Sequence, residues 1–148
     1  MGLDMYLYKK EFVNPVKEDE NKIIEWKNVF SKDEINSVEL KEVSYIVLEV
    51  GYWRKVNAVH RWFVENIQHG VDNCAAYYVT YAQLQELKEL CLKALSDRDR
   101  AIEYLPPQSG FFFGSVEPDE WYFQGLEDTV KIISKLSPDG EYEYQSSW

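Results

Sequence analysis

The 148-residue sequence has only two cysteines and no long apolar run, and these absences exclude several classes of protein. Cys74 and Cys91 lack a C-x-x-C partner or a histidine-rich neighbourhood, so no metal site is expected and a reducing compartment fits. No stretch is apolar enough to cross a bilayer, and no charged-then-apolar leader is present. We therefore expect a cytoplasmic protein without a membrane partner, a metal or a cofactor.

Positive charge is also scarce relative to negative charge, since 16 Lys and Arg residues stand against 26 Asp and Glu residues, which gives a formal net charge of −10 at neutral pH. Such a balance repels phosphate backbones, so neither DNA nor RNA is expected as a partner. The acidity is concentrated in residues 111–148, which carry eight acidic side chains against two lysines. That segment either forms a solvated acidic face or imitates a phosphate backbone toward a nucleic-acid-binding protein.

Aromatic residues are abundant at 16% of the chain, within a hydrophobic total of 45%. This composition predicts a single domain over residues 1–148 whose core needs no disulfide. Residues 10–42, approximately, are polar and rich in loop-forming residues, and we interpret them as an insertion that serves as a lid or recognition segment. The aromatic surface also favours a homodimer.

The periodicity of apolar residues predicts an α+β fold, with a small, mainly antiparallel sheet and about three helices packed largely on one face. Strands are expected at 3–8, 43–50, 76–79 and 141–148, the first and last being neighbours and the second central. Helices are expected at 52–69, from Thr80 to about 95, and from about 118 to 136. The second helix opens with a capping box formed by Thr80 and Gln83. A short buried strand is expected over 110–115.

The expected 52–69 helix organises the rest of the chain, and its start is unusual. Its apolar stripe contains Val56, Val59, Phe63 and Ile67, and Gly70 suits its end. No Ser, Thr, Asp or Asn caps its first turn, where Arg54 and Lys55 add two cations. Free N–H groups beside cations favour an anion or a phosphate. The alternative is that a carboxylate from elsewhere in the chain pairs with Arg54.

Two further residues of this helix have alternative interpretations. His60 lies in the apolar stripe. It is either a half-buried residue bonded to a backbone carbonyl or a general base. No nucleophile elbow, P-loop or paired-metal motif accompanies it. Trp62 lies nearly opposite the stripe, so it either packs against a second layer or stands exposed as an interaction anchor.

Four motifs, in order, resemble a family of small phage, prophage and bacterial proteins. They are Met1-Gly2-Leu3-Asp4-Met5-Tyr6-Leu7, Gly51-Tyr52-Trp53-Arg54-Lys55 with Asn57 and His60, Gly110-Phe111-Phe112-Phe113-Gly114-Ser115 before Asp119-Glu120-Trp121-Tyr122, and Tyr144-Gln145-Ser146-Ser147-Trp148. The resemblance covers essentially the whole chain and brings no activity with it. It implies a phage accessory protein, with roles such as inhibiting a host defence protein or sequestering a nucleotide signal.

The leading hypothesis is a non-catalytic binding module with an aromatic and cationic pocket for a small anionic, nucleotide-like ligand. Its expected site residues are Tyr52, Trp53, Arg54, Lys55, Asn57, His60, Phe112, Ser115, Asp119 and Tyr122. The first alternative is an acidic protein-interaction module that inhibits a host protein, and the second is a small hydrolase using His60 with Asp119 or Glu120. The direction of Arg54 distinguishes the binding module from the protein-interaction module. In the first, Arg54 faces a concave aromatic site, and in the second it faces a surface carboxylate.

Overall fold

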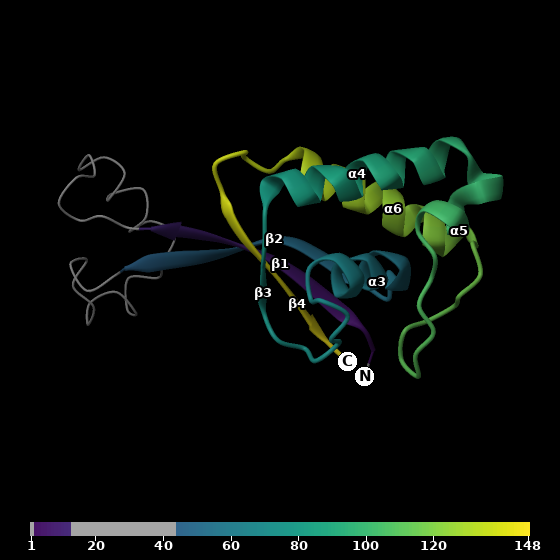
Figure 1. Cartoon of the computed structure of the whole chain (residues 1–148), viewed down its shortest axis with the longest axis horizontal. Helices are drawn as coiled ribbons and strands as arrows, with labels where there is room; N and C mark the ends of the chain where they lie inside the picture. The colour runs from purple at the N-terminus through teal and green to yellow at the C-terminus, as the bar shows by residue number, and fades with distance from the viewer. Residues whose placement is uncertain (1, 13–43) are drawn as a thin grey trace, which may run out of the picture. The chain divides into compact units, whose positions relative to one another are not determined.

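A computed structural model describes residues 2–12 and 44–148 of the chain. The described residues 2–9 and 49–148 form one compact unit, and residues 10–12 and 44–48 belong to a second unit. The insertion expected at 10–42 lies outside the described residues except for 10–12, which belong to the first strand. The elements in order (Figure 1) are β1 (Asp4–Phe12), β2 (Tyr45–Arg54), α3 (Asn57–Asn66), β3 (Tyr77–Val79), α4 (Tyr81–Ser96), the 3₁₀ helix η2 (Arg98–Arg100), α5 (Ala101–Tyr104), α6 (Glu120–Ser134) and β4 (Glu141–Ser147).

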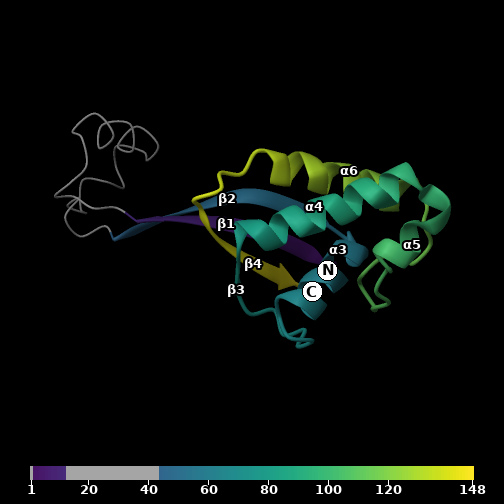
Figure 2. The same ribbon diagram turned by 45° about the horizontal axis from the view of Figure 1, so that its top comes forward.

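The four strands form one antiparallel sheet in the order β2-β1-β4-β3. The prediction that the first and last strands are neighbours is confirmed, and Figures 1 and 2 both show the two chain ends side by side. At the β3 edge, Tyr77 pairs with Tyr144 and Val79 with Tyr142. This pairing brings residues far apart in the sequence onto the same face of the sheet.

Alternation along the strands explains which face of the sheet the helices cover. Met5 and Leu7 of β1, and Leu3 just before it, are fully buried, while the residues between them are half-buried. They join the inward side chains of α3, α4 and α6 in one core. At its centre the rings of Phe63 and Tyr144 stack with centroids 3.7 Å apart. The predicted α+β fold with helices on one face is therefore confirmed.

The expected boundary between the second strand and the 52–69 helix was wrong. Strand β2 continues through Arg54, and α3 runs only from Asn57 to Asn66. Gly51 and Trp53 face the core in strand alternation, and a Cβ at Gly51 would lie 2.7 Å from Ile132. Strand β2 is also an edge strand rather than a central one. Its β-branched composition indicated a strand but carried no information about its place in the sheet.

Residues 110–115 form a turn, so the expected buried strand was wrong. The Phe113 N–H donates to the Gly110 carbonyl at 3.2 Å, which folds the Phe113 ring back over the glycine. A Cβ at Gly110 would lie 2.6 Å from that ring. Phe111 is 95% exposed whereas Phe113 is buried. The short helix α5 was not predicted, and it ends at Tyr104, before Pro106 and Pro107.

One local prediction about a helix end is confirmed, because Thr80 and Gln83 form a reciprocal capping box at the start of α4. Gly70 adopts a positive φ of 79°, but α3 ends earlier than expected, at Asn66. Trp62 is buried, which decides the open alternative in favour of packing rather than an exposed anchor. Within the described ranges, no helix combines the length and apolar character needed to cross a membrane.

Candidate functional site

A hollow of about 320 Å³ lies at the start of α3, and we refer to it as the α3 hollow. Its lining comes from the end of β2, the first turn of α3, the turn after Phe113 and the start of α6. The lining residues are Arg54, Lys55, Val56, Asn57, Ala58, Gly114, Ser115, Asp119, Trp121 and Tyr122. Six of the ten predicted site residues therefore meet there: Arg54, Lys55, Asn57, Ser115, Asp119 and Tyr122.

The start of α3 lines the hollow through Val56, Asn57 and Ala58. A helix leaves its first four N–H groups without intrahelical acceptors. The N-cap residue is Val56, and no side chain caps this end, as the sequence predicted. The helix dipole adds partial positive charge at the same place. This end of α3 therefore has the electrostatic character of an anion site.

Lys55 turns the chain from β2 into α3 in a strained conformation. Its φ of 58° lies in the left-handed region, which costs a non-glycine residue about 1 kcal/mol or more. Its N–H donates to the Leu3 carbonyl at 2.8 Å, and this bond holds the turn against the strain. Strained residues of this kind concentrate at binding sites.

Arg54 satisfies both of the alternatives that the sequence left open. Its side chain lines the α3 hollow, and its Nη1 also lies 3.8 Å from the Asp4 carboxylate. That carboxylate accepts a much shorter hydrogen bond of 2.6 Å from the Tyr52 hydroxyl. A long, exposed ion pair contributes little free energy, so Asp4 holds Arg54 only loosely.

The two aromatic residues at the start of α6 have different roles in the hollow. Tyr122 donates its hydroxyl to the Leu105 and Ala101 carbonyls, and burial raises its pKa to about 12, so it serves as a wall. Trp121 is 82% exposed and offers a ring face. Trp121 was not among the predicted site residues. Its position off the apolar stripe of α6 was the sequence signal that could have indicated an exposed ring.

Asn57 clamps the segment 108–115 to α3. Its Nδ2 donates to the carbonyls of Phe113 at 3.0 Å and Ser115 at 2.8 Å, and its Oδ1 accepts from the Gln108 N–H at 3.2 Å. Asn57 is buried, so these three bonds use its amide internally. Similarly, Asp119 caps α6 by accepting from the Tyr122 N–H. Both side chains therefore shape the α3 hollow.

The structure places the other four predicted site residues outside the α3 hollow. Tyr52 lies on the outward side of β2 and bonds to Asp4. Trp53 is buried and donates its Nε1–H to Thr129 Oγ1 at 2.9 Å. Phe112 lines a separate cavity, and His60 is fully buried. Strand alternation explains Tyr52 and Trp53, because it separates their side chains onto opposite faces.

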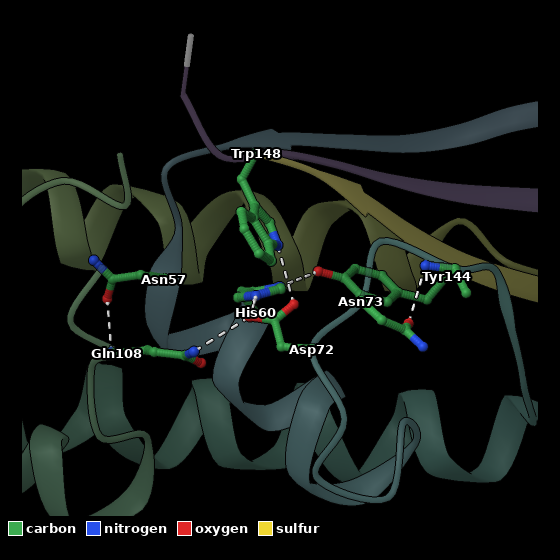
Figure 3. A network of polar contacts seen from close by, with 8 residues as sticks. Asn57, His60, Asp72, Asn73, Gln108, Tyr144 and Trp148 are labelled. Atoms are coloured by element: carbon green, nitrogen blue, oxygen red, sulfur yellow. Dashed lines mark hydrogen bonds and ion pairs between the residues drawn. The ribbon is translucent and has the colours of Figure 1, made fainter. Parts of the chain in front are cut away.

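His60 is the centre of a buried polar network (Figure 3). Its Nε2 lies 2.9 Å from Asp72 Oδ2, and its Nδ1 lies 2.7 Å from the Tyr144 hydroxyl. Desolvation by burial lowers the pKa of His60, which favours the neutral ring. Since a carboxylate only accepts, Nε2–H donates to Asp72 and Nδ1 accepts from Tyr144. Both ring nitrogens are thus engaged with side chains, not with the expected backbone carbonyl.

The described residues contain no group of three or more His, Cys, Asp or Glu side chains that could hold a metal ion. The fold and the site together define an α+β domain with a four-stranded antiparallel sheet and a cationic, aromatic hollow at a helix start. Compared with known proteins, the chain matches no family model, no curated protein and no solved structure. The resemblance to phage and prophage proteins therefore stays a prediction that depends on the four sequence motifs.

Proposed function

We propose that this protein is a phage-type accessory protein whose non-catalytic α3 hollow binds a small anionic, nucleotide-like ligand. The observation that carries the proposal is the convergence of two cations, an uncapped helix start and an exposed tryptophan on one hollow. Its volume of about 320 Å³ falls at the lower end of the range for small-molecule sites, roughly 300–1,000 Å³.

The chemistry of the lining suggests how such a ligand would be oriented. A phosphate is expected at the α3 end, where Arg54, Lys55 and the first N–H groups are positive. The Asp119 carboxylate repels a phosphate at the α6 end. A base or another flat ring is expected there, on Trp121, since stacking on an aromatic side chain contributes about 1–3 kcal/mol per base.

Native mass spectrometry of gently purified protein, followed by denaturing analysis of released small molecules, tests this proposal. We expect a nucleotide-like mass that is retained by Arg61→Ala and lost from Arg54→Ala. Arg61 is the control, because it is a partly exposed arginine of α3 that pairs with Glu65 and does not line the hollow. A ligand retained equally by Arg54→Ala would overturn the assignment of Arg54 to the site.

Calorimetry with adenosine 5′-monophosphate and with inorganic phosphate separates the two halves of the site. Trp121→Ala is expected to weaken the nucleotide roughly tenfold or more and to leave phosphate unchanged, because only the nucleotide stacks. Trp121 is exposed, so this substitution should leave the fold intact. If neither probe binds to the wild-type protein at millimolar concentration, the anionic pocket is refuted.

A second candidate function is supported by exposed aromatic side chains within the acidic segment 111–148. Phe111 and Trp121 stand out from the surface, and large exposed rings are common anchors of protein interfaces. We propose as the alternative an acidic interaction module that inhibits a host protein. A pull-down from host lysate that depends on both rings and is unaffected by Arg54→Ala would favour it over the ligand pocket.

A further inference from the structure

A second cavity, of about 340 Å³, lies beside the buried His60 network, and we refer to it as the aromatic cavity. Four aromatic rings line it, those of Phe111, Phe112, Phe113 and Trp148, together with the Asp72 carboxylate. It shares no lining residue with the α3 hollow. Neither Asp72 nor Trp148 was a predicted site residue, because nothing local in the sequence indicates that they meet.

The rings stand at steep angles to one another. Phe111 and Phe112 form an edge-to-face pair with centroids 4.8 Å apart at 87°, and Phe113 and Trp148 form one at 6.0 Å and 67°. Gly110 permits this arrangement, since the Phe113 ring packs directly against its backbone. Rings held edge to face cannot all lie flat along one wall. Phe111 and Trp148 are exposed and Phe112 is half-buried, so these three rings are accessible to a ligand, whereas Phe113 is buried.

The Asp72 carboxylate has hydrogen-bond donors but no cation among its recorded partners in the described residues. Trp148 Nε1–H donates to Oδ1 at 3.0 Å, while His60 Nε2–H at 2.9 Å and Gln108 Nε2 at 3.4 Å reach Oδ2. Figure 3 shows the Trp148 indole standing over His60 and Asp72. Burial lowers the pKa of His60, so the imidazole does not neutralise this carboxylate at neutral pH. Its negative charge faces an aromatic space.

We propose that the aromatic cavity binds an organic cation that carries a trimethylammonium group. The faces of aromatic rings attract cations through their quadrupole, and Asp72 supplies the opposite full charge. An anion would be repelled by Asp72. A metal ion would find one carboxylate where it needs several ligands. A neutral apolar ligand would strip water from the carboxylate without replacing its charge partner.

Titration calorimetry on the full chain tests this proposal with choline and its neutral isostere 3,3-dimethylbutan-1-ol. Choline is expected to bind at least about tenfold more tightly, because only the cation gains from the rings and the carboxylate. Equal affinities, or no choline binding at millimolar concentration, would overturn it. A trimethyl-lysine peptide and phosphatidylcholine vesicles, measured separately, show whether the natural source is a free molecule, a protein tail or a lipid headgroup.

Two variants and one control locate the cation. Phe111→Ala is expected to weaken choline severalfold and to fold normally, because this side chain is almost entirely exposed. Tyr78→Ala, which removes another exposed ring on β3, is the matched control and should leave the affinity unchanged. Asp72→Asn keeps an acceptor for His60 but removes the charge, so it should abolish the preference for choline over the alcohol. If both Phe111→Ala and Asp72→Asn bind choline normally, the site is wrongly placed.

The cation site does not depend on the proposed anion site. Arg54→Ala should leave choline binding unchanged, because Arg54 lines the α3 hollow only. Conversely, Phe111→Ala should leave binding of adenosine 5′-monophosphate unchanged. Failure of one site therefore leaves the other proposal standing.

Discussion

His60 Nε2 and Asp72 Oδ2 lie 2.9 Å apart, and this contact joins a fully buried imidazole to a carboxylate at the edge of a cavity. The same imidazole meets Tyr144 on β4 through its other nitrogen. The network therefore links α3, the turn after it and the sheet. Its protonation state affects the stability of all three.

Stability is expected to fall as the pH decreases below about 6.5, with His60 as the cause. Burial lowers the folded-state pKa of His60 below its ordinary value of 6.5. Below pH 6.5 the unfolded chain binds a proton that the folded protein excludes, so the free energy of unfolding decreases by up to about 1.4 kcal/mol per pH unit. That loss continues until the pH reaches the folded-state pKa.

Urea unfolding at several pH values between 5 and 8 measures this dependence. His60→Gln should flatten the curve between pH 5.5 and 6.5 relative to the wild type. His69→Gln replaces the second histidine of the chain and should retain the wild-type slope. Identical slopes for all three proteins would show that His60 titrates in the same way in both states.

Asn57→Ala should destabilise the protein by on the order of 3 kcal/mol, since it removes three hydrogen bonds to backbone groups, one of them buried and two partly buried. Hydrogen exchange should accelerate across 108–115, the segment that Asn57 clamps. Asn66→Ala is the control, because Asn66 is exposed and donates one bond to the Trp62 carbonyl. A loss confined to global stability, without faster exchange at 108–115, would contradict the clamp.

Gly125→Ala should destabilise the wild-type protein by about 1–3 kcal/mol through overpacking. A Cβ at Gly125 would lie 2.7 Å from Val56 Cγ1, at the start of α3. In a Val56→Ala background the clash disappears, and the same substitution should stabilise α6 by up to about 1 kcal/mol, as alanine is the better helix former. Thermal unfolding of the four proteins in this double-mutant cycle checks the change of sign.

Only one of the two thiols should react rapidly in the native protein. Burial raises the pKa of Cys91 to about 12, so its thiolate is scarce at neutral pH, whereas Cys74 is partly exposed. Ellman's reagent should titrate one thiol in buffer and two in guanidinium. Cys74→Ser should abolish the rapid native reaction. Rapid reaction of both thiols in buffer would mean that the core around Cys91 opens readily.

Local sequence patterns predicted much of the fold and part of the α3 hollow. The alternation of Leu3, Met5 and Leu7, the Thr80 capping box and the missing cap before α3 all depend on neighbours within a few residues. The start of α3 could not be located in this way, because residues 52–56 fit a helix stripe as well as a strand. The contact of Gly51 with Ile132 decided for the strand, and that contact joins residues far apart in the chain.

By itself, then, the sequence determined the α+β class, the Thr80 capping box, the position of His60 in the apolar stripe and the absence of a side-chain cap before α3. Tertiary structure alone decided that β2 lies at an edge, that Asn57 clamps 108–115, and that Asp72 faces the rings of Phe111 and Trp148. The physical reason is the separation along the sequence over which each kind of interaction acts. Periodicity and capping act over one or two helical turns, whereas the contact of His60 with Tyr144 spans 84 residues and depends on the place of β4 beside β1 in the sheet.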